Sequence, residues 1–305
     1  MKILLTGATG FIGSQLALRM VAEGHELAIV VRPGSDLNIL KAILPTITVH
    51  VYDGSHDSLL LALQMSEPEL VVHVASLFLA QHKVKDVARL IESNVQFPAQ
   101  LLEAMHQTGI RQLLNTGTSW QNYQDESYNP VNLYAASKQA FEAILEYYVK
   151  AQGFKVITLK LFDTYGPGDL RPKLFSLLRK TVRSGNMLPM SPGEQEIDLV
   201  YIDDVLDAFL IAVQQIKAVR DAETYAVSNP LRLTLRELVE IYGEIVGLML
   251  NVKWGGLPYR AREVMTPWSC GKALPGWKNK IAIREGILRM EKDARISGIL
   301  AESRP

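Results

Sequence analysis

The sequence is poor in features that define whole classes of proteins. It has a single cysteine, Cys270, which excludes an internal disulfide and a cysteine-rich metal site and fits a reducing compartment. Its six histidines show no metal-ligand spacing such as HExxH, so we expect no metal. No apolar run approaches the roughly 18 residues that a membrane span needs. The apolar residues that follow Met1 are too few for a signal-peptide core, and we therefore expect a cytoplasmic protein without a membrane partner.

The chain also lacks a net charge. Lys+Arg and Asp+Glu both count 32, which gives no whole-protein attraction to nucleic acid, and we expect no such partner. Hydrophobic residues make up 48% and charged residues 21% of the 305 residues, the profile of a globular protein with one large or two modest domains.

Short apolar runs rich in Val, Ile and Leu alternate with longer helical patterns through the first two-thirds of the chain. The runs predict strands at 2–7, 25–31, 46–52, 69–76, 111–117 and 154–162. The helical patterns lie at 13–24, 56–65, 92–109 and 132–153. This alternation predicts an α/β fold, a doubly wound parallel sheet covered by helices on both faces.

The pattern changes after Phe162, where Pro- and Gly-rich segments begin. Residues 197–216 read as a strand and a helix that rejoin the sheet. We therefore expect a dinucleotide-binding Rossmann domain from 1–162 with 196–228. A smaller, interleaved substrate lobe would take 163–195 with 229–305.

The segment GATGFIG places Gly7, Gly10 and Gly13 directly after the first predicted strand and at the start of a helix. The first glycine allows the tight turn, the second lets the backbone approach a pyrophosphate, and the third lets the helix pack closely on the strand. The phosphates would lie at the positive end of the helix. The motif in this context predicts a dinucleotide site.

The end of the second strand bears on which dinucleotide binds. Arg32 follows Gly13 by 19 residues, at the place where an arginine meets the 2′-phosphate of NADP, and Ser35 is a second donor. Asp36 competes as an acceptor for an NAD ribose but has the position of a helix cap. NADP(H) is the preferred interpretation, with NAD as the alternative. Asp53, after the third strand, either binds the adenine amino group or caps a turn.

Tyr134 and Lys138 are four residues apart in a predicted helix and so share one face. An isolated tyrosine has a pKa near 10, which is too high for proton exchange at neutral pH. A nearby ammonium group favours the phenolate and makes the tyrosine a usable acid. Thr118 ends the fifth strand, where a parallel sheet presents its ligands, and is expected to hold the reacting oxygen.

The segments GATGFIG, HVAS, NTGTS, YAASK and LFDTYGPGD, with Asn94, resemble the extended short-chain dehydrogenase/reductase family of nucleotide-sugar enzymes. The likeness is firm over about 1–230. It implies a doubly wound domain, a nicotinamide cofactor, a catalytic trio of Thr118, Tyr134 and Lys138, and the homodimer common in that family. Further cofactor contacts are implied for Phe11, Ile12, Ala75, Asn94, Tyr134 and Lys138. Asn94 can instead be a satisfied core residue.

The residues after Thr118 narrow the reaction. The 4,6-dehydratases of the family carry an Asp-Glu pair there, whereas this chain has Ser119 and Trp120. The chain is also similar to 4-ketoreductases of the CDP-abequose and CDP-paratose synthase type in the segments SWQNY, NLYAASKQAFEAILEYY, LFDTYGPGD, MSPGEQEIDLVYIDDV and YRAREVMTPW. They imply NADPH-dependent reduction of a CDP-4-keto-3,6-dideoxyhexose in the biosynthesis of deoxysugars for lipopolysaccharide O-antigen. The alternatives are an NAD-dependent nucleotide-sugar 4-epimerase and a non-catalytic NADP-binding regulator.

The same likeness implies a set of substrate contacts. Asp163 stands where many relatives have an asparagine that touches the sugar nucleotide. Arg260 is expected to bind the diphosphate, with Arg262 as a competitor. The other candidates, besides Thr118, are Ser76, Trp120 as a wall of the sugar pocket, Arg171 and Lys173. The helices that bear Asn94 and Tyr134 are expected to form the homodimer, and apolar residues such as Phe141, Ile144, Leu145 and Tyr148 belong either to that contact or to the core.

Overall fold

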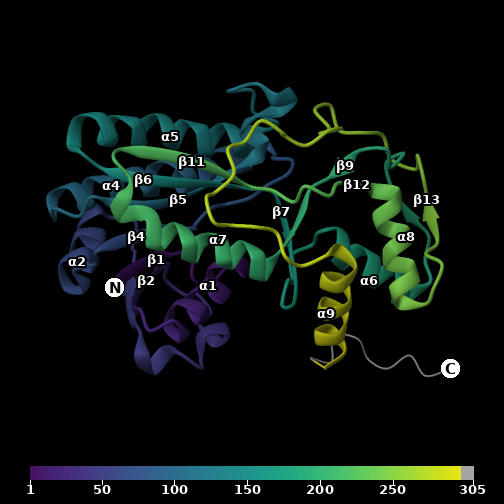
Figure 1. Ribbon diagram of the computed structural model, residues 1–305, viewed down its shortest axis with the longest axis horizontal. Coiled ribbons are helices and arrows are strands. Elements are labelled where there is room, and N and C mark those ends of the chain that lie inside the picture. Colours follow the sequence, from purple (N-terminus) through teal and green to yellow (C-terminus); the bar gives the residue numbers. More distant parts are fainter. Residues whose placement is uncertain (297–305) are drawn as a thin grey trace. The chain divides into compact units, whose positions relative to one another are not determined.

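The computed structural model describes residues 1–296. Seven parallel strands form its main sheet, in the order β11-β6-β5-β4-β1-β2-β3 (Figure 1). They are β1 (Lys2–Thr6), β2 (Glu26–Val31), β3 (Thr48–Val51), β4 (Leu70–His73), β5 (Gln112–Thr118), β6 (Lys155–Leu161) and β11 (Ala222–Val227). The predicted doubly wound fold is confirmed. The strand order reverses between β1 and β4, the place where open α/β sheets bind their ligands.

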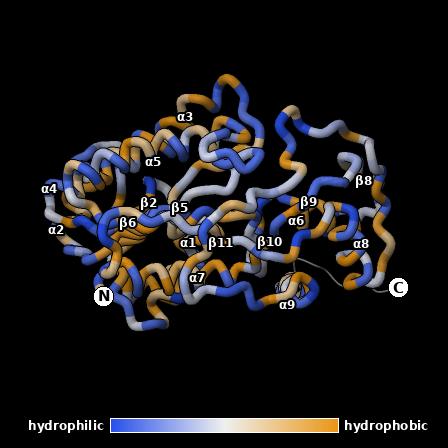
Figure 2. The backbone as a smooth tube through the Cα atoms, turned by 45° about the horizontal axis from the view of Figure 1, so that its top comes forward, coloured by the Kyte–Doolittle hydropathy of each residue, from blue (hydrophilic) through white to orange (hydrophobic). Residues whose placement is uncertain are grey.

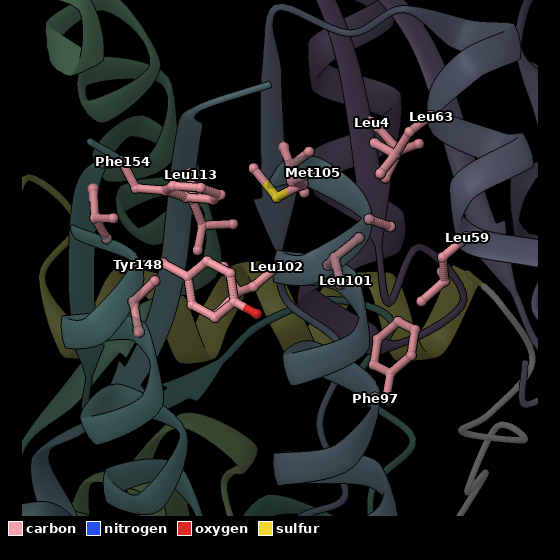
Figure 3. Close-up of a cluster of buried hydrophobic side chains, with 14 of the residues drawn as sticks. Leu4, Leu59, Leu63, Phe97, Leu101, Leu102, Met105, Leu113, Tyr148 and Phe154 are labelled. Atoms are coloured by element: carbon pink, nitrogen blue, oxygen red, sulfur yellow. The ribbon is translucent and has the colours of Figure 1, made fainter. Parts of the chain in front are cut away.

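Helices α2 (His56–Ser66), α4 (Phe97–Gln107) and α5 (Leu133–Gln152) cover one face of this sheet. Their apolar side chains pack with Leu4, Val71 and Leu113 in one cluster (Figure 3). Ile3 and Leu5 alternate with Leu4 and are equally buried, so the opposite face is covered as well. Helix α1 (Phe11–Ala22) and the later part of α7 (Ile202–Gln215) lie there (Figure 1).

Helix α5 is the longest helix of the described residues, and its ends follow from its sequence. Asn132 caps the start, because its side chain accepts a hydrogen bond from the backbone of Ala135 at 2.9 Å. Gly153 ends the helix in the left-handed conformation, with φ of 69°. Hydrophobic and hydrophilic residues alternate along the helix (Figure 2). Phe141, Leu145 and Tyr148 belong to the core cluster, and Ile144 packs against it.

The helix expected at 92–109 has a local irregularity. α3 (Val87–Ile91) runs into a π-helical turn, η4 (Glu92–Gln96), and α4 then begins at Phe97 with Pro98 in its first turn. α4 follows the π-helical turn without a break, because the backbone amide of Phe97 donates to the carbonyl of Glu92, and Pro98 has no amide hydrogen to donate. π-helical turns are frequent at functional sites, and this one contains Asn94.

The remaining strands form three pairs outside the main sheet: β7 (Asp163–Tyr165) with β10 (Leu199–Tyr201), β9 (Glu196–Ile197) with β12 (Leu233–Thr234), and β8 (Leu188–Pro189) with β13 (Val252–Lys253). The prediction that the strand after residue 197 rejoins the main sheet was wrong. The edge next to β6 is taken by β11 instead. β7 continues the chain directly beyond β6, and its backbone pairs with β10.

Two compact units share the chain. The first contains 1–161, 206–227 and 270–277, and the second contains 162–205, 228–269 and the described residues from 278 onward. Compared with the expected boundaries, 196–205 belongs to the second unit because of the β7–β10 pair. Residues 270–277 belong to the first because Ala273 bridges to Ala226 of β11.

The second unit also contains α6 (Leu174–Ser184), α8 (Leu235–Val246) and α9 (Ile283–Ile296). Arg179 of α6 donates to Glu291 of α9 at 2.8 Å, and both side chains are nearly inaccessible. A buried pair of this kind is strongly destabilising to break, because one charge is then left without its partner. Short 3₁₀ turns complete the fold: η1 (Asn38–Leu40), η2 (Leu44–Thr46), η3 (Val84–Asp86), η5 (Ser119–Gln121), η6 (Tyr123–Asp125) and η7 (Ile216–Ala218).

Candidate active site

The glycine turn after β1 lies at the reversal of strand order. Gly7 has φ of 80°, and a Cβ atom there would lie 2.6 Å from the backbone nitrogen of Ala75. A Cβ on Gly13 would collide with the carbonyl oxygen of Gly7. Both positions therefore need glycine for the packing of the chain itself, and the backbone of Ala75 lies against the turn at Gly7.

Gly10 differs from the other two glycines. It is exposed, its φ is −85°, and a Cβ atom would meet only the Gly7 oxygen at an ordinary 3.4 Å. The fold itself therefore does not require glycine at this position. The absence of a side chain fits a ligand that approaches the backbone here, so the turn suits the pyrophosphate of a dinucleotide.

Gly10 is also the cap residue of α1. No side chain caps the helix, and its first turn contains no acidic residue. Phe11 and Ile12, the first two helical residues, therefore present their backbone amides at the positive end of the helix without a competing carboxylate. The residues present fit a bound dinucleotide phosphate.

Arg32 lies directly after β2 and is exposed. Its carbonyl accepts a hydrogen bond from the backbone of Ser35 at 3.1 Å, which closes a turn through Pro33 and Gly34. No acidic side chain of residues 1–296 pairs with the Arg32 guanidinium. Asp36 accepts from the backbone of Asn38 at 2.9 Å, so its carboxylate supports the next turn. The Arg32 guanidinium is therefore available to a ligand after β2, whereas the Asp36 carboxylate already accepts a hydrogen bond from Asn38.

Asp53 follows β3 and is engaged in the turn before α2. It accepts hydrogen bonds from the hydroxyl of Ser55 at 2.6 Å and from the backbone of Ser55 at 2.9 Å. These bonds hold the pKa of Asp53 below its ordinary value. Of the two roles considered from sequence, the turn contact is present within the chain.

Asn94 connects the loop after β4 to α5. Its side-chain oxygen accepts from the backbone of Leu77 at 2.8 Å and from the hydroxyl of Ser76 at 3.1 Å. Its amide nitrogen donates to the carbonyl of Leu77 at 3.0 Å and to the hydroxyl of Ser137 at 2.9 Å. The buried side chain thereby sets the backbone that follows β4, and the predicted residues Ser76 and Asn94 meet.

Thr118 ends β5 and is held against α5 by one glutamine. The side-chain oxygen of Gln121 accepts from the backbone of Thr118 at 2.9 Å, and its amide donates to Gln139 of α5 at the same distance. The Thr118 hydroxyl accepts a bond from the backbone of Trp120 at 3.3 Å. The 3₁₀ turn after β5 and the helix that bears Tyr134 therefore form one unit around Thr118.

Tyr134 and Lys138 lie in the first two turns of α5. Lys138 is 2% exposed, and its burial lowers its pKa from 10.5 to about 8, while the charge of Glu142 acts in the opposite direction. Tyr134 is only half buried. The pair thus combines a buried cation with a reachable phenol.

Phe78 is a neighbour that the sequence reasoning missed. Its ring lies edge-on to Tyr134 at 5.0 Å and tilted against Trp120 at 5.6 Å. Phe78 lies in the loop after β4, and its side chain is 40% exposed. An aromatic residue soon after the carboxyl end of β4 was the available signal. Phe78 therefore connects Tyr134 to Trp120 in a short row of aromatic rings.

The predicted substrate residues of the second unit are engaged with neighbouring acids. Lys173 binds Asp163 at 3.1 Å, so these two candidates meet. Arg171 makes two bonds of 2.7 Å to the carboxylate of Asp169 and a third to the carbonyl of Thr164. Exposed Arg260 pairs with Glu263 at 3.1 Å.

Asp198, close to this group, was not a candidate from sequence. It is buried and accepts from the hydroxyl of Ser228 and the backbone of Asn229. Burial raises its pKa from 3.8 to about 6, and the charge of Asp163 adds to the effect.

No three His, Cys, Asp or Glu side chains of residues 1–296 are grouped to hold a metal ion. None of the helices in this part of the chain is long and apolar enough to cross a membrane.

Known proteins match the chain over nearly its whole length. The CDP-abequose synthase of Yersinia pseudotuberculosis is 30% identical over 270 residues, which are 88% of this chain and 92% of that protein. The UDP-glucose 4-epimerase of Thermus thermophilus, solved in complex with NAD, has a TM-score of 0.81 at 24% identity and covers 97% of this chain and 99% of its own. DesIV from Streptomyces venezuelae, a dTDP-glucose 4,6-dehydratase solved with NAD, has a TM-score of 0.84 at 20% identity and covers 98% of each chain. The two structures show the fold alone.

The sequence profile of the NAD dependent epimerase/dehydratase family matches residues 3–228, which is well over half of the chain. Together with the 30% identity to a CDP-abequose synthase, this match shows that the chain belongs to the NAD dependent epimerase/dehydratase family, whose members are enzymes that bind a nicotinamide dinucleotide.

Proposed function

We propose that the protein is an NADPH-dependent reductase of the 4-keto group of a nucleotide-activated deoxyhexose, with CDP-4-keto-3,6-dideoxyhexose as the preferred substrate. The observation that carries this proposal is the chemistry around Tyr134. Lys138 lies one helical turn from Tyr134, and Thr118 ends the strand before that helix. The ring of Phe78 lies edge-on to Tyr134 and also contacts Trp120. No carboxylate follows Thr118, so the acid and base that sugar dehydration needs are missing from that position.

In the proposed reaction the dinucleotide, when bound, supplies the hydride. Tyr134 donates its phenolic proton to the carbonyl oxygen as C4 is reduced, and the product is a 4-hydroxy sugar. The hydroxyl of Thr118 donates a hydrogen bond to the same oxygen and fixes its position. Lys138, as an ammonium group, favours the phenolate that Tyr134 becomes and binds the nicotinamide ribose. Solvent then returns a proton to Tyr134.

Arg32 and the glycine turn support NADPH as the cofactor. The exposed Arg32 has no acidic partner among the described side chains, so its cation is available for the 2′-phosphate, with Ser35 as a second donor. The carboxylate that could bind an unphosphorylated ribose, Asp36, is engaged by Asn38. Gly10 leaves room at the start of α1 for the pyrophosphate.

The aromatic side of the site supports a deoxysugar. Phe78 presents carbon surface beside Tyr134, and Trp120 packs against Phe78. A hexose that lacks hydroxyl groups at C3 and C6 has carbon surface to place against these rings. A sugar with both hydroxyl groups would lose hydrogen bonds to water there without replacement. The relative at 30% identity carries the name CDP-abequose synthase, which agrees with this substrate class. Substrate contacts from Asp163, Lys173, Arg171 and Arg260 are part of the proposal.

The test is NADPH oxidation by the purified protein with CDP-4-keto-3,6-dideoxyhexose. NADH and the dTDP- and GDP-linked analogues are assayed alongside. Rapid loss of NADPH with the CDP substrate, and slower loss with the other combinations, is the expected result. Interconversion of an unreduced sugar nucleotide without added cofactor would instead identify a 4-epimerase. Tight NADP binding without turnover of any keto-sugar would identify a regulator.

A further inference from the structure

Glu142 is a partly buried acid on the same helix face as the Tyr134–Lys138 pair. It follows Lys138 by four residues and Tyr134 by eight, and positions at this spacing share one face of a helix. Its Oε1 atom is inaccessible to water and accepts no hydrogen bond from residues 1–296. Leaving such an oxygen without a partner is costly unless charge compensates for it.

The Glu142 carboxylate lies against the backbone just before Thr118. A Cβ atom built on Gly117 would be 3.0 Å from Glu142 Oε1, 3.0 Å from Gln121 Oε1 and 3.0 Å from Lys160 Cγ. Three side chains from α5, η5 and β6 therefore converge on one glycine. Any larger residue at 117 would displace them, so the glycine makes room for this polar cluster.

Two buried cations face this carboxylate. Lys138 is 2% exposed and Lys160 is 6% exposed, and Lys160 Nζ donates to Asn122 at 2.7 Å. Burial lowers the pKa of both lysines, and in both the charge of Glu142 opposes that effect. The negative charge of Glu142 thus favours the protonated form of both lysines.

The other groups near Lys138 do not compensate its charge. His73 of β4 is fully buried, and its pKa lies well below 6.5 because of burial and the charge of Lys138, so it is neutral. On the helices packed against α5, Arg89 and Glu92 are exposed. Glu103 of α4 accepts from the hydroxyl of Tyr148 at 2.8 Å. Gln121 and Gln139 carry no charge.

We propose that Glu142 is a positioning residue that keeps Lys138 charged and in place, one helical turn from Tyr134. The carboxylate balances the ammonium groups of Lys138 and Lys160, and Lys138 in turn acts on Tyr134. This inference rests on the proposed function only for the role of Tyr134. The effect of Glu142 on the charge of Lys138 does not depend on which reaction the protein catalyses.

The primary test measures the protonation of Lys138 in the cofactor-free protein. Lysine labelled with ¹³C at Cε is followed by NMR as a function of pH, and the Lys138→Met variant assigns the signal. In Glu142→Gln, which keeps the shape and removes the charge, the midpoint should fall by about one pH unit or more. Glu146→Gln is the matched control, because Glu146 is exposed on the same helix, and its midpoint should equal that of the wild type.

An unchanged Lys138 midpoint in folded Glu142→Gln overturns the inference, since packing alone would leave it unchanged. Should that variant not fold, Glu142→Asp keeps the charge on a shorter side chain. The Lys138 midpoint should then stay within one unit of the wild-type value, and a fall as large as the one expected for removal of the charge would contradict the proposal.

The second readout is the pH profile of NADPH-dependent turnover. Its high-pH limb should move to lower pH in Glu142→Gln by the same amount as the NMR midpoint, and stay in place in Glu146→Gln. An enzyme that reduces no keto-sugar in any form contradicts the proposed function. In that case the NMR titration still decides whether Glu142 sets the charge of Lys138.

Discussion

The side-chain amide of Asn94 donates a hydrogen bond of 2.9 Å to the hydroxyl of Ser137, although 43 residues separate them. The bond is buried and connects the π-helical turn η4 to the first turns of α5. The same side chain binds the backbone of Leu77 in both directions. One asparagine therefore joins the loop after β4 to the helix that bears Tyr134 and Lys138.

Replacing Asn94 by alanine should destabilise the protein and disturb the site. The change leaves the amide and carbonyl of Leu77 and the hydroxyl of Ser137 without their partner, which should lower the free energy of unfolding by about 2–4 kcal/mol. Urea unfolding measures this, and cofactor affinity should weaken as well. Gln96→Ala, an exposed position of the same turn, should change neither quantity. Equal effects of the two variants would contradict the bridging role.

Replacing Tyr134 by phenylalanine should abolish turnover and leave cofactor binding nearly intact. The change removes only the proton donor, so kcat should fall by about 10²–10⁴-fold. NADPH affinity, followed by fluorescence titration, should be unchanged. Tyr147→Phe provides the control, because Tyr147 lies on the same helix and is 57% exposed. Retained turnover in Tyr134→Phe would rule out the assigned proton donor.

Arg32→Ala should weaken NADPH and spare NADH. A charged hydrogen bond to the 2′-phosphate is lost, so the KM for NADPH should rise by about tenfold or more. The KM for NADH, which lacks that phosphate, should stay the same. Lys41→Ala, another exposed cation nearby in sequence, should alter neither value. If NADPH and NADH weaken equally, Arg32 does not read the phosphate.

Gly10→Ala and Gly13→Ala should separate binding from folding. At Gly13 the new methyl group collides with the Gly7 carbonyl, and the variant should lose about 1–3 kcal/mol of stability. At Gly10 the methyl group meets only ordinary contacts, so Tm should change little while NADPH affinity falls severalfold. Tm measured without NADPH reports the stability of each variant, and the rise in Tm on adding NADPH reports its affinity for the cofactor. Full affinity in Gly10→Ala would exclude a close approach of the pyrophosphate at that residue.

Asp198 should make stability fall as the pH rises through mildly acidic values. Burial raises its pKa in the folded protein from 3.8 to about 6, so between these values the folded state holds a proton that the unfolded chain has released. Stability from this group is therefore complete below about pH 4 and is lost as the pH rises towards about 6. Asp198→Asn should remove this component from the pH dependence of Tm. Identical profiles for the variant and the wild type would contradict the shift.

Much of the fold and of the candidate site follows from local sequence. The strand and helix alternation identifies all strands of the main sheet except its β11 edge as part of that sheet, because hydrophobic period and turn residues are short-range signals. The glycine spacing and the four-residue interval from Tyr134 to Lys138 are equally local, since each lies within one turn or one helix. The glycine turn follows β1, Thr118 ends β5, and Tyr134 lies on the next helix. This order along the chain predicts the site before any tertiary contact is known.

Contacts between distant segments were decided only by the tertiary structure. Periodicity indicates that residues 199–201 form a strand, but their pairing with β7 rather than with the main sheet depends on backbone partners that sequence does not name. The same holds for Phe78 beside Tyr134 and for the carboxylate of Glu142 between Lys138 and Lys160. The local sequence pattern shows which face of a helix or strand a side chain occupies. The neighbours of that side chain, and the charges near it, depend on which distant segments the folded chain packs against that face.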